Sequence, residues 1–184
     1  MVNLHFESFP QLVTERLVLR QLQLTDAPAI RQLRSDEQVN TYLGRKGTIN
    51  MEEAKAFIHK IETTINNHEG LYWAITLKHH PALIGTCCYW NIEQEKEMAE
   101  IGYELFPAFQ GKGLMQEAIA TVINFGFEQM HLETITALPE TGNSQSIRVL
   151  TKNNFILDGE NQIVSKEDAD GLAVYYLNKN QLVS

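Results

Sequence analysis

The sequence predicts a mixed α/β domain built on one sheet that carries helices on both faces. Strand-like stretches outnumber helical ones, three of them follow one another directly, and helices separate the strands near the C-terminus. The predicted order is one strand, two helices, three strands, a helix, a strand, a helix and two strands. Directly successive strands pair antiparallel, whereas helical crossovers join parallel strands. A mostly antiparallel sheet of seven strands is therefore expected.

The first half of the chain supplies a strand, two helices and a hairpin. Residues Val13 to Leu22 alternate between apolar and polar side chains and predict the first strand. A capping residue followed by Pro28 begins a short helix, and apolar residues at helical spacing predict a second helix over Met51–Asn66. Two apolar runs, Leu71–Leu77 and Leu83–Trp90, flank a break that contains a proline. They predict a β-hairpin.

The second half holds the elements that carry motifs. Residues Ala99 to Phe106 predict a strand in which Glu100, Gly102 and Glu104 share one face. Apolar residues repeat at helical spacing from Gly113 to Met130, the clearest helix of the chain. The remaining predicted elements are the strand Glu133–Leu138, the helix Asn143–Asn153 and the strands Phe155–Leu157 and Leu172–Leu177.

Composition narrows the class of protein. A chain of 184 residues with 43% hydrophobic content suits one domain over residues 1–184. Its net charge of -8 disfavours nucleic acid as a partner, and no apolar run approaches the length that spans a membrane. The start of the chain lacks a secretory signal pattern. The two cysteines, Cys87 and Cys88, are adjacent, so we expect reduced thiols and a cytoplasmic protein.

A glycine-rich turn precedes the long helix. The segment Gln110–Met115 contains two glycines, and glycine lets the backbone turn sharply and approach a ligand closely. The N–H groups at a helix start have no intrahelical partners, and the helix dipole adds positive charge, so such a turn suits a phosphate. Lys112 adds a further positive charge. The alternative is a plain tight turn, because the segment completes neither the dinucleotide-binding GxGxxG motif nor the P-loop.

The same segment resembles the coenzyme-binding signature of the GNAT family of acetyltransferases. Gln110, Gly113 and Met115 fall at the positions of its Q/R-x-x-G-x-G/A pattern, and Leu105 and Pro107 match the strand end before it. Three further segments resemble the branch that acetylates the N-termini of ribosomal proteins. They are Thr14–Arg20, Ala99–Tyr103 and Asn143–Phe155.

The resemblance covers nearly the whole chain in the right order, with two departures. Met115 stands where the signature often has Gly or Ala, although the ribosomal-protein branch resembles the form with Met. Asn154 stands where a glycine usually precedes the phenylalanine. Asparagine is the next best residue for a left-handed helix cap, so the turn is expected to survive.

The resemblance implies acetyl-CoA as co-substrate and a GNAT-like sheet that splays at its central parallel strands. The pantetheine arm would lie where Leu105 diverges from the strand that begins near Glu133. Asn143 would lie close to that arm. The pyrophosphate would sit on backbone N–H groups of the turn, contributed by Gln110, Gly111, Lys112, Gly113, Leu114 and Met115.

Acetyl transfer to an amine requires a base for the amine and a proton donor for the leaving thiolate. For the base we select Glu100, acting directly or through a water, because the family pattern has a carboxylate there. Glu104, on the same face, is the reserve. Ser146 is the candidate partner of the thiolate. No His or Cys spacing indicates a metal site. Each carboxylate also has an ordinary interpretation as an exposed strand residue, and Asn143 as a helix cap.

The predicted function is therefore an acetyl-CoA-dependent N-acetyltransferase. A thioester hydrolase would need a nucleophile or a held water, for which no Cys or Ser signature is present. A non-catalytic module that binds coenzyme A or a nucleotide remains the alternative outside the enzymes. Ribosomal protein N-termini, other peptides, polyamines and aminoglycosides all remain open as acceptors, and the acidic surface favours a cationic one. By analogy, we expect a monomer or homodimer.

Overall fold

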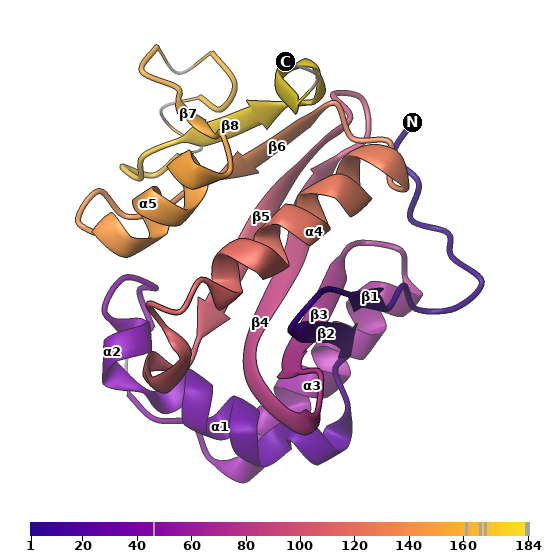
Figure 1. Cartoon of the computed structure of the whole chain (residues 1–184), viewed down its shortest axis with the longest axis vertical. Helices are drawn as coiled ribbons and strands as arrows, with labels where there is room; N and C mark the ends of the chain where they lie inside the picture. The colour runs from indigo at the N-terminus through magenta and orange to yellow at the C-terminus, as the bar shows by residue number, and fades with distance from the viewer. Residues whose placement is uncertain (46, 161, 166, 168, 183–184) are drawn as a thin grey trace.

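The computed structural model describes residues 1–45, 47–160, 162–165, 167 and 169–182, and one sheet organises them (Figure 1). Its strand order is β1-β2-β3-β4-β5-β6-β8-β7, and only β5 and β6 pair in parallel. The predicted mixed, mostly antiparallel sheet is confirmed, with eight strands in place of seven. The strands are β1 (Leu12–Val13), β2 (Leu17–Gln21), β3 (Leu71–Leu77), β4 (His80–Glu93), β5 (Met98–Leu105), β6 (Thr134–Ala137), β7 (Ile156–Leu157) and β8 (Tyr175–Asn178).

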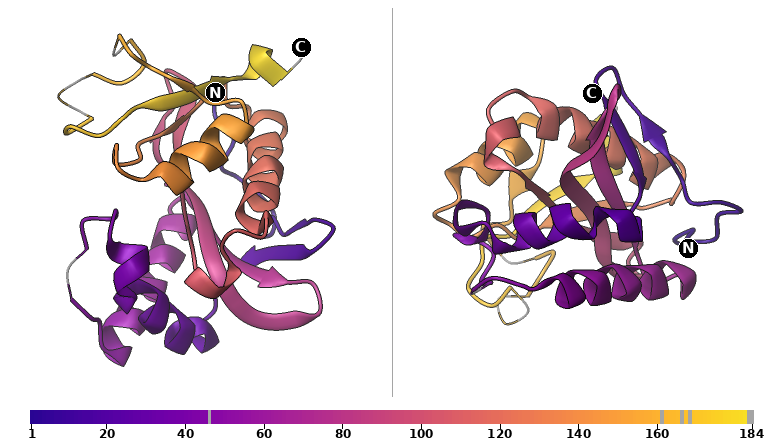
Figure 2. Two further views of the ribbon diagram at one scale, coloured as in Figure 1. Left: turned by 60° about the vertical axis from the view of Figure 1, so that its left-hand side comes forward. Right: turned by 90° about the horizontal axis from the view of Figure 1, so that it is seen from below.

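Helices cover both faces of the sheet, as predicted (Figure 2). The helices are α1 (Ala27–Ser35), α2 (Glu37–Asn40), α3 (Met51–Asn66), α4 (Leu114–Glu128) and α5 (Ser144–Lys152). One face packs against α4 in a core that includes Trp73, Tyr89 and Ile119. The other face packs against α1 and α3 through Ile30 and Ile58. The sheet therefore separates two environments, and side chains that alternate along one strand enter different ones.

The eighth strand arises because the predicted first strand, Val13–Leu22, is interrupted. The hydroxyl of Thr14 accepts a hydrogen bond from the backbone N–H of Leu17, and the Thr14 N–H donates to the Leu17 carbonyl. These bonds close a turn between β1 and β2. The hairpin between β3 and β4 also differs from its prediction, since His80 already belongs to β4.

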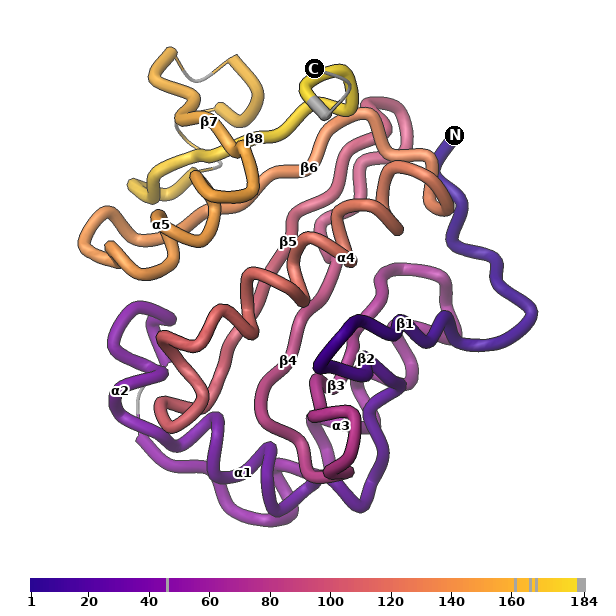
Figure 3. The backbone as a smooth tube through the Cα atoms, in the orientation of Figure 1, coloured from indigo at the N-terminus to yellow at the C-terminus, as the bar shows by residue number. Residues whose placement is uncertain are grey.

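The sheet opens between β5 and β6. The two strands pair only from Met98 to Glu100, opposite Thr134 to Thr136, whereas β5 runs on to Leu105. In Figure 3 the tubes of β5 and β6 diverge below this pairing. Five residues of β5 thus have β4 as a neighbour on one side only, an open edge of about 13 Å. The predicted splay between Leu105 and the strand near Glu133 is confirmed.

The helix that follows β6 ends as predicted from Asn154. That residue adopts a left-handed conformation with φ +64°. The N–H of Asn154 donates to the Thr151 carbonyl and the N–H of Phe155 donates to the Leu150 carbonyl, which completes a Schellman cap. The departure from glycine therefore leaves the turn intact. Among the described residues, no helix is long and apolar enough to span a bilayer.

Candidate active site

The glycine turn has the shape of an anion site. Gly111 and Gly113 have φ angles of +73° and +74°, a region that residues with a Cβ avoid. Gly113 is the N-cap of α4, so the N–H groups of the first helical turn lack intrahelical acceptors. The side chains of Leu114 and Met115 are buried in the core. These two side chains therefore point away from the turn, and methionine in place of Gly or Ala does not obstruct it.

Two polar side chains of the turn have partners within the protein. Gln110 Nε2 donates to the Leu105 carbonyl at 2.9 Å, which ties the turn to the open end of β5. Lys112 Nζ donates to the Ala108 carbonyl at 2.7 Å and lies 5.6 Å from the centroid of the Phe109 ring. The lysine ammonium is thus folded back onto the segment before the turn. The turn itself offers backbone N–H groups and the helix dipole.

The turn between β1 and β2 docks on the start of α4. Glu117 accepts hydrogen bonds from the Thr14 hydroxyl, from the Arg16 N–H at 2.8 Å and from Arg16 Nε at 2.6 Å. Arg16 Nη1 donates to the Lys112 carbonyl at 3.0 Å. The segment Thr14–Arg20 resembles the family pattern, but its polar residues alone gave no sign of this contact with α4.

Glu100 lies near the apex of the splay, on the face of β5 that it shares with Glu104. Burial raises the pKa of this half-buried carboxyl, and hydrogen bonds from Asn91 and Trp90 partly oppose the rise. Asn91 Nδ2 donates to Glu100 Oε2 at 2.9 Å. A carboxylate whose pKa is raised towards the working pH is a better proton acceptor than an ordinary surface glutamate.

Glu104 is engaged in a different way. Its side chain is 8% exposed and forms an ion pair with Arg45. The Thr86 hydroxyl donates to Glu104 Oε1 at 3.3 Å. These contacts occupy the Glu104 carboxylate, so it is less free than Glu100 to contact an acceptor amine.

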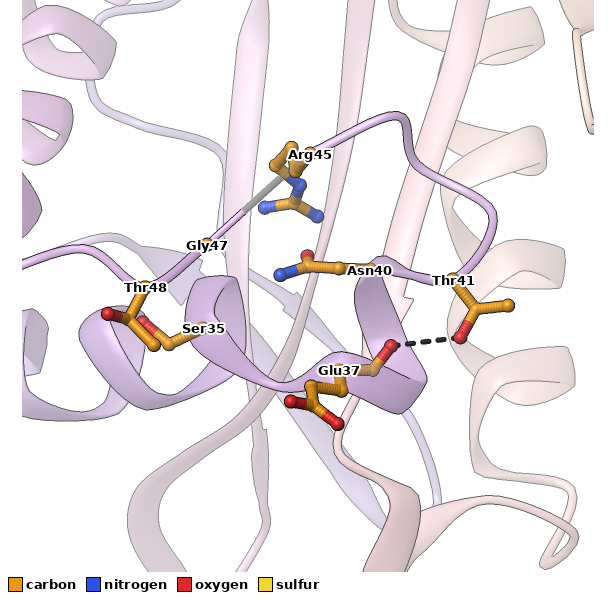
Figure 4. A pocket seen from close by; sticks show the side chains of 7 residues that line it. All are labelled: Ser35, Glu37, Asn40, Thr41, Arg45, Gly47 and Thr48. Atoms are coloured by element: carbon orange, nitrogen blue, oxygen red, sulfur yellow. Dashed lines mark hydrogen bonds between the residues drawn. The ribbon is translucent and has the colours of Figure 1, made fainter.

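A polar pocket of about 250 Å³ lies beside Arg45 (Figure 4). The Thr41 hydroxyl donates to the Glu37 carbonyl within it. Buried Asn40 Oδ1 and Arg45 Nη1 have no hydrogen-bond partner in the described part of the chain. A side chain at Gly142 would lie 3.4 Å from the Tyr42 ring, so the loop after α2 meets the loop before α5. The pocket is lined by Ser35, Glu37, Asn40, Thr41, Arg45, Gly47 and Thr48.

Ser146 lies in the first turn of α5 and reaches β5 through a tyrosine. Asn143 is the N-cap, and its Oδ1 accepts from the Ser146 N–H at 3.0 Å, so the capping role is confirmed. Ser146 Oγ and Tyr103 Oη are 2.7 Å apart. Burial raises the pKa of Tyr103, and the Ser146 hydrogen bond partly opposes this, so the phenol stays protonated at neutral pH. No pattern in the sequence revealed this partner, which β5 supplies from more than forty residues away.

Glu100 and Ser146 approach the splay from opposite faces of the sheet. Glu100 and Tyr103 are three residues apart on one strand, so their side chains point in opposite directions. Trp90 is 51% exposed beside Glu100, whereas Trp73 and Tyr89 are buried. No group of His, Cys, Asp or Glu side chains able to hold a metal occurs among the described residues.

Comparisons with known proteins agree with this geometry. Residues 16–156 match the family model described as an acetyltransferase (GNAT) domain. An uncharacterized N-acetyltransferase, YoaA of Bacillus subtilis, is 34% identical over 151 residues, which are 82% of this chain and 85% of YoaA. The ribosomal-protein-serine acetyltransferase of Escherichia coli is 34% identical over 77 residues, 42% of this chain and 43% of that protein. Mycobacterium smegmatis RimJ, solved in complex with CoA-disulfide, superposes with a TM-score of 0.78 at 18% identity over 91% of this chain and 84% of RimJ.

Proposed function

The chain belongs to the GNAT family of acetyltransferases, and on that premise we propose that it moves the acetyl group of acetyl-CoA to a primary amine, either a protein N-terminal α-amine or a small amine. One observation carries the proposal. The open edge of β5 leads directly into a glycine turn that exposes the N–H groups at the start of α4. An extended amide-containing arm and a pyrophosphate fit these two features in that order.

The coenzyme contacts are proposed along this path. Phe106 N–H donates to the Ile84 carbonyl, so alternation directs the backbone groups of Tyr103 and Leu105 to the open edge. These groups would pair with the pantetheine amides, with Leu105 sharing its carbonyl with Gln110. The N–H groups from Gln110 to Met115 would bind the pyrophosphate, and Asn143 would border the arm.

The catalytic roles follow from the two faces of the splay. Bound acetyl-CoA supplies a thioester whose carbonyl carbon is already reactive towards an amine. Glu100 removes the proton from the acceptor ammonium, directly or through one water, which frees the nitrogen lone pair. Ser146 donates its hydroxyl proton to the leaving thiolate and takes one from Tyr103, which regains a proton from solvent, while Glu100 releases the acceptor's proton to solvent. Proximity supplies much of the rate enhancement.

The acceptor is proposed to arrive on the α1 and α3 face, where Glu100 and the polar pocket beside Arg45 lie. A protein N-terminus is one candidate, since the relatives include a ribosomal-protein-serine acetyltransferase. The net charge of -8 favours a cationic acceptor. The proposal also includes one catalytic domain over residues 1–184, as a monomer or homodimer. A cytoplasmic location is included as well, with which the free thiols of Cys87 and Cys88 are consistent.

Calorimetric titration with acetyl-CoA, followed by thiol release with a panel of amines and basic N-terminal peptides, tests the proposal. We expect binding, and thiol release that depends on the acceptor. Binding with no release from any acceptor would favour a module that holds coenzyme A without turnover. Absence of binding would overturn the proposed function.

A further inference from the structure

The Thr14–Arg16 turn and Glu117 form a hydrogen-bonded clamp at the glycine turn. Glu117 is 18% exposed on its side chain, and both of its carboxylate oxygens accept hydrogen bonds from this turn. Arg16 Nη1 reaches past the carboxylate to the Lys112 carbonyl. The clamp therefore joins three segments: the turn after β1, the glycine turn at Lys112 and the first turn of α4.

The carbonyl that Arg16 holds lies at the most adaptable point of the loop. Lys112 stands between Gly111 and Gly113, both at positive φ. Glycine populates many backbone conformations, so a loop with two of them loses entropy when it adopts one shape. A guanidinium that is itself fixed by a carboxylate can hold this loop in a single conformation, because its planar fork donates in two directions at once.

We propose that Thr14, Arg16 and Glu117 are positioning residues that hold the glycine turn in its phosphate-binding conformation, so that acetyl-CoA affinity depends on them. The inference rests on the proposed function, because it assigns the coenzyme pyrophosphate to this turn. It explains why a motif at the N-terminal edge of the sheet accompanies a coenzyme signature almost a hundred residues later. The clamp acts through the backbone of Lys112 and needs no contact with the ligand.

The direction in which Glu117→Gln changes acetyl-CoA affinity distinguishes a positioning role from a simple effect of charge. Glu117 places a negative charge in the first turn of α4, close to where a polyanionic coenzyme would bind. If charge alone mattered, Glu117→Gln would strengthen acetyl-CoA binding. The clamp requires the opposite, because the Arg16 N–H and Arg16 Nε donate to different oxygens of Glu117 and glutamine replaces one of these oxygens with an amide nitrogen that cannot accept.

The test measures acetyl-CoA affinity by calorimetry on the full chain. We expect Glu117→Gln to weaken binding about tenfold. Arg16→Lys keeps the positive charge and should also weaken binding, because an ammonium lacks the fork. The matched control is Glu128→Gln, which removes the same charge from the exposed far end of α4 and should leave affinity unchanged.

Steady-state kinetics supply a readout that general destabilisation would not give. The KM for acetyl-CoA should rise in Glu117→Gln, while kcat and the KM for the acceptor stay at wild-type values. Unchanged or tighter binding by Glu117→Gln, or wild-type affinity of Arg16→Lys, would overturn the clamp. If the wild-type protein itself does not bind acetyl-CoA, the proposed function fails, an outcome distinct from equal affinities of wild type and variant.

Discussion

The proposed coenzyme region and the proposed acceptor region of the splay differ in the groups that they present to a ligand. The proposed coenzyme region presents backbone N–H and C=O groups, and apart from Asn143 they belong to the continuous stretch 103–117. The acceptor region presents side chains from β4, β5 and the loop after α2, and it is held together by contacts such as Asn91 with Glu100 and Arg45 with Glu104. A backbone site depends on where glycine permits a turn, whereas a side-chain site depends on tertiary neighbours.

Because of this difference, substitutions in the two regions should have distinguishable effects. Changes in the coenzyme region should alter acetyl-CoA affinity and leave the chemical step intact. Changes beside Glu100 should alter the chemical step and leave acetyl-CoA affinity intact. Substitutions in each region therefore test whether the two regions act independently.

The largest effect is expected from Glu100→Gln. An amide of the same shape cannot accept the proton of the acceptor ammonium, so kcat should fall by about 10²-fold or more. Acetyl-CoA affinity, measured by calorimetry, should match the wild type because the glycine turn is untouched. A wild-type rate at neutral pH would remove Glu100 as the base. A large loss of coenzyme affinity would show that the two regions are coupled.

The same variant should change the pH dependence of stability. The folded-state pKa of Glu100 is raised by burial, so the folded protein favours the protonated carboxyl. This contribution is fully present below the ordinary pKa near 4.5 and is lost as pH rises through the raised folded value. Glu100→Gln should therefore melt at a higher temperature than the wild type at neutral pH, and the difference should shrink in acid. A lower melting temperature at neutral pH would contradict this sign.

Gly113→Val should give the next largest effect, on affinity. The residue has φ +74°, where a β-branched side chain is strained, and its Cβ would lie 3.5 Å from Arg16 Nη2. We expect acetyl-CoA binding to weaken by about 10- to 100-fold, since a penalty of about 1–2 kcal/mol for the left-handed backbone adds to the loss of the turn shape. Saturated with acetyl-CoA, the variant should turn over near the wild-type rate. Wild-type affinity would remove the turn as the phosphate site.

Ser146→Ala should reduce kcat by about tenfold, because the leaving thiolate loses its donor while the reactive thioester remains. Tyr103→Phe is the matched variant. It removes the hydroxyl that lies 2.7 Å from Ser146 Oγ and should have a smaller effect through the same pair. Burst kinetics of thiol release would detect both. A wild-type rate for Ser146→Ala would show that water protonates the thiolate.

Features that depend on a short stretch of sequence could be predicted, whereas features that depend on contacts between distant residues could not. The turn at Gly113 and the cap at Asn154 follow from short-range patterns, the splay at Leu105 follows from the resemblance to the GNAT family, and the structure contains all three. The predicted first strand, Val13–Leu22, is divided into β1 and β2 because the Thr14 hydroxyl accepts a hydrogen bond from the Leu17 N–H, which no periodicity reveals.

The tertiary neighbours of individual side chains could not be predicted for the same reason. Tyr103 partners Ser146 only because β5 passes α5, and their separation in the sequence gives no sign of it. Trp90 is exposed although it ends an apolar run, which the pattern of that run does not reveal. Lys112 was expected to add a positive charge at the turn, and the sequence did not reveal that its ammonium donates to the Ala108 carbonyl.

The smallest expected effect tests how far side-chain neighbours tune the acceptor region. Asn91 adopts φ +45°, so Asn91→Gly removes its amide without straining the backbone. The hydrogen bond from Asn91 lowers the pKa of Glu100, and its loss should raise that pKa further. The acid limb of the kcat/KM profile should therefore move to higher pH, with a few-fold loss of rate on the limb and wild-type rates above it.

The profile must be compared with one acceptor throughout, so that titration of the amine is common to both enzymes. Acetyl-CoA affinity serves as the internal control, since Asn91 lies on β4 and makes no contact with the glycine turn among the interactions of the described residues. A limb that stays in place, or moves to lower pH, would show that Asn91 does not tune the base. Because Glu100 owes its raised pKa first to burial, a limb that moves up with unchanged affinity would show that tertiary neighbours set the chemistry while the backbone turn sets the binding.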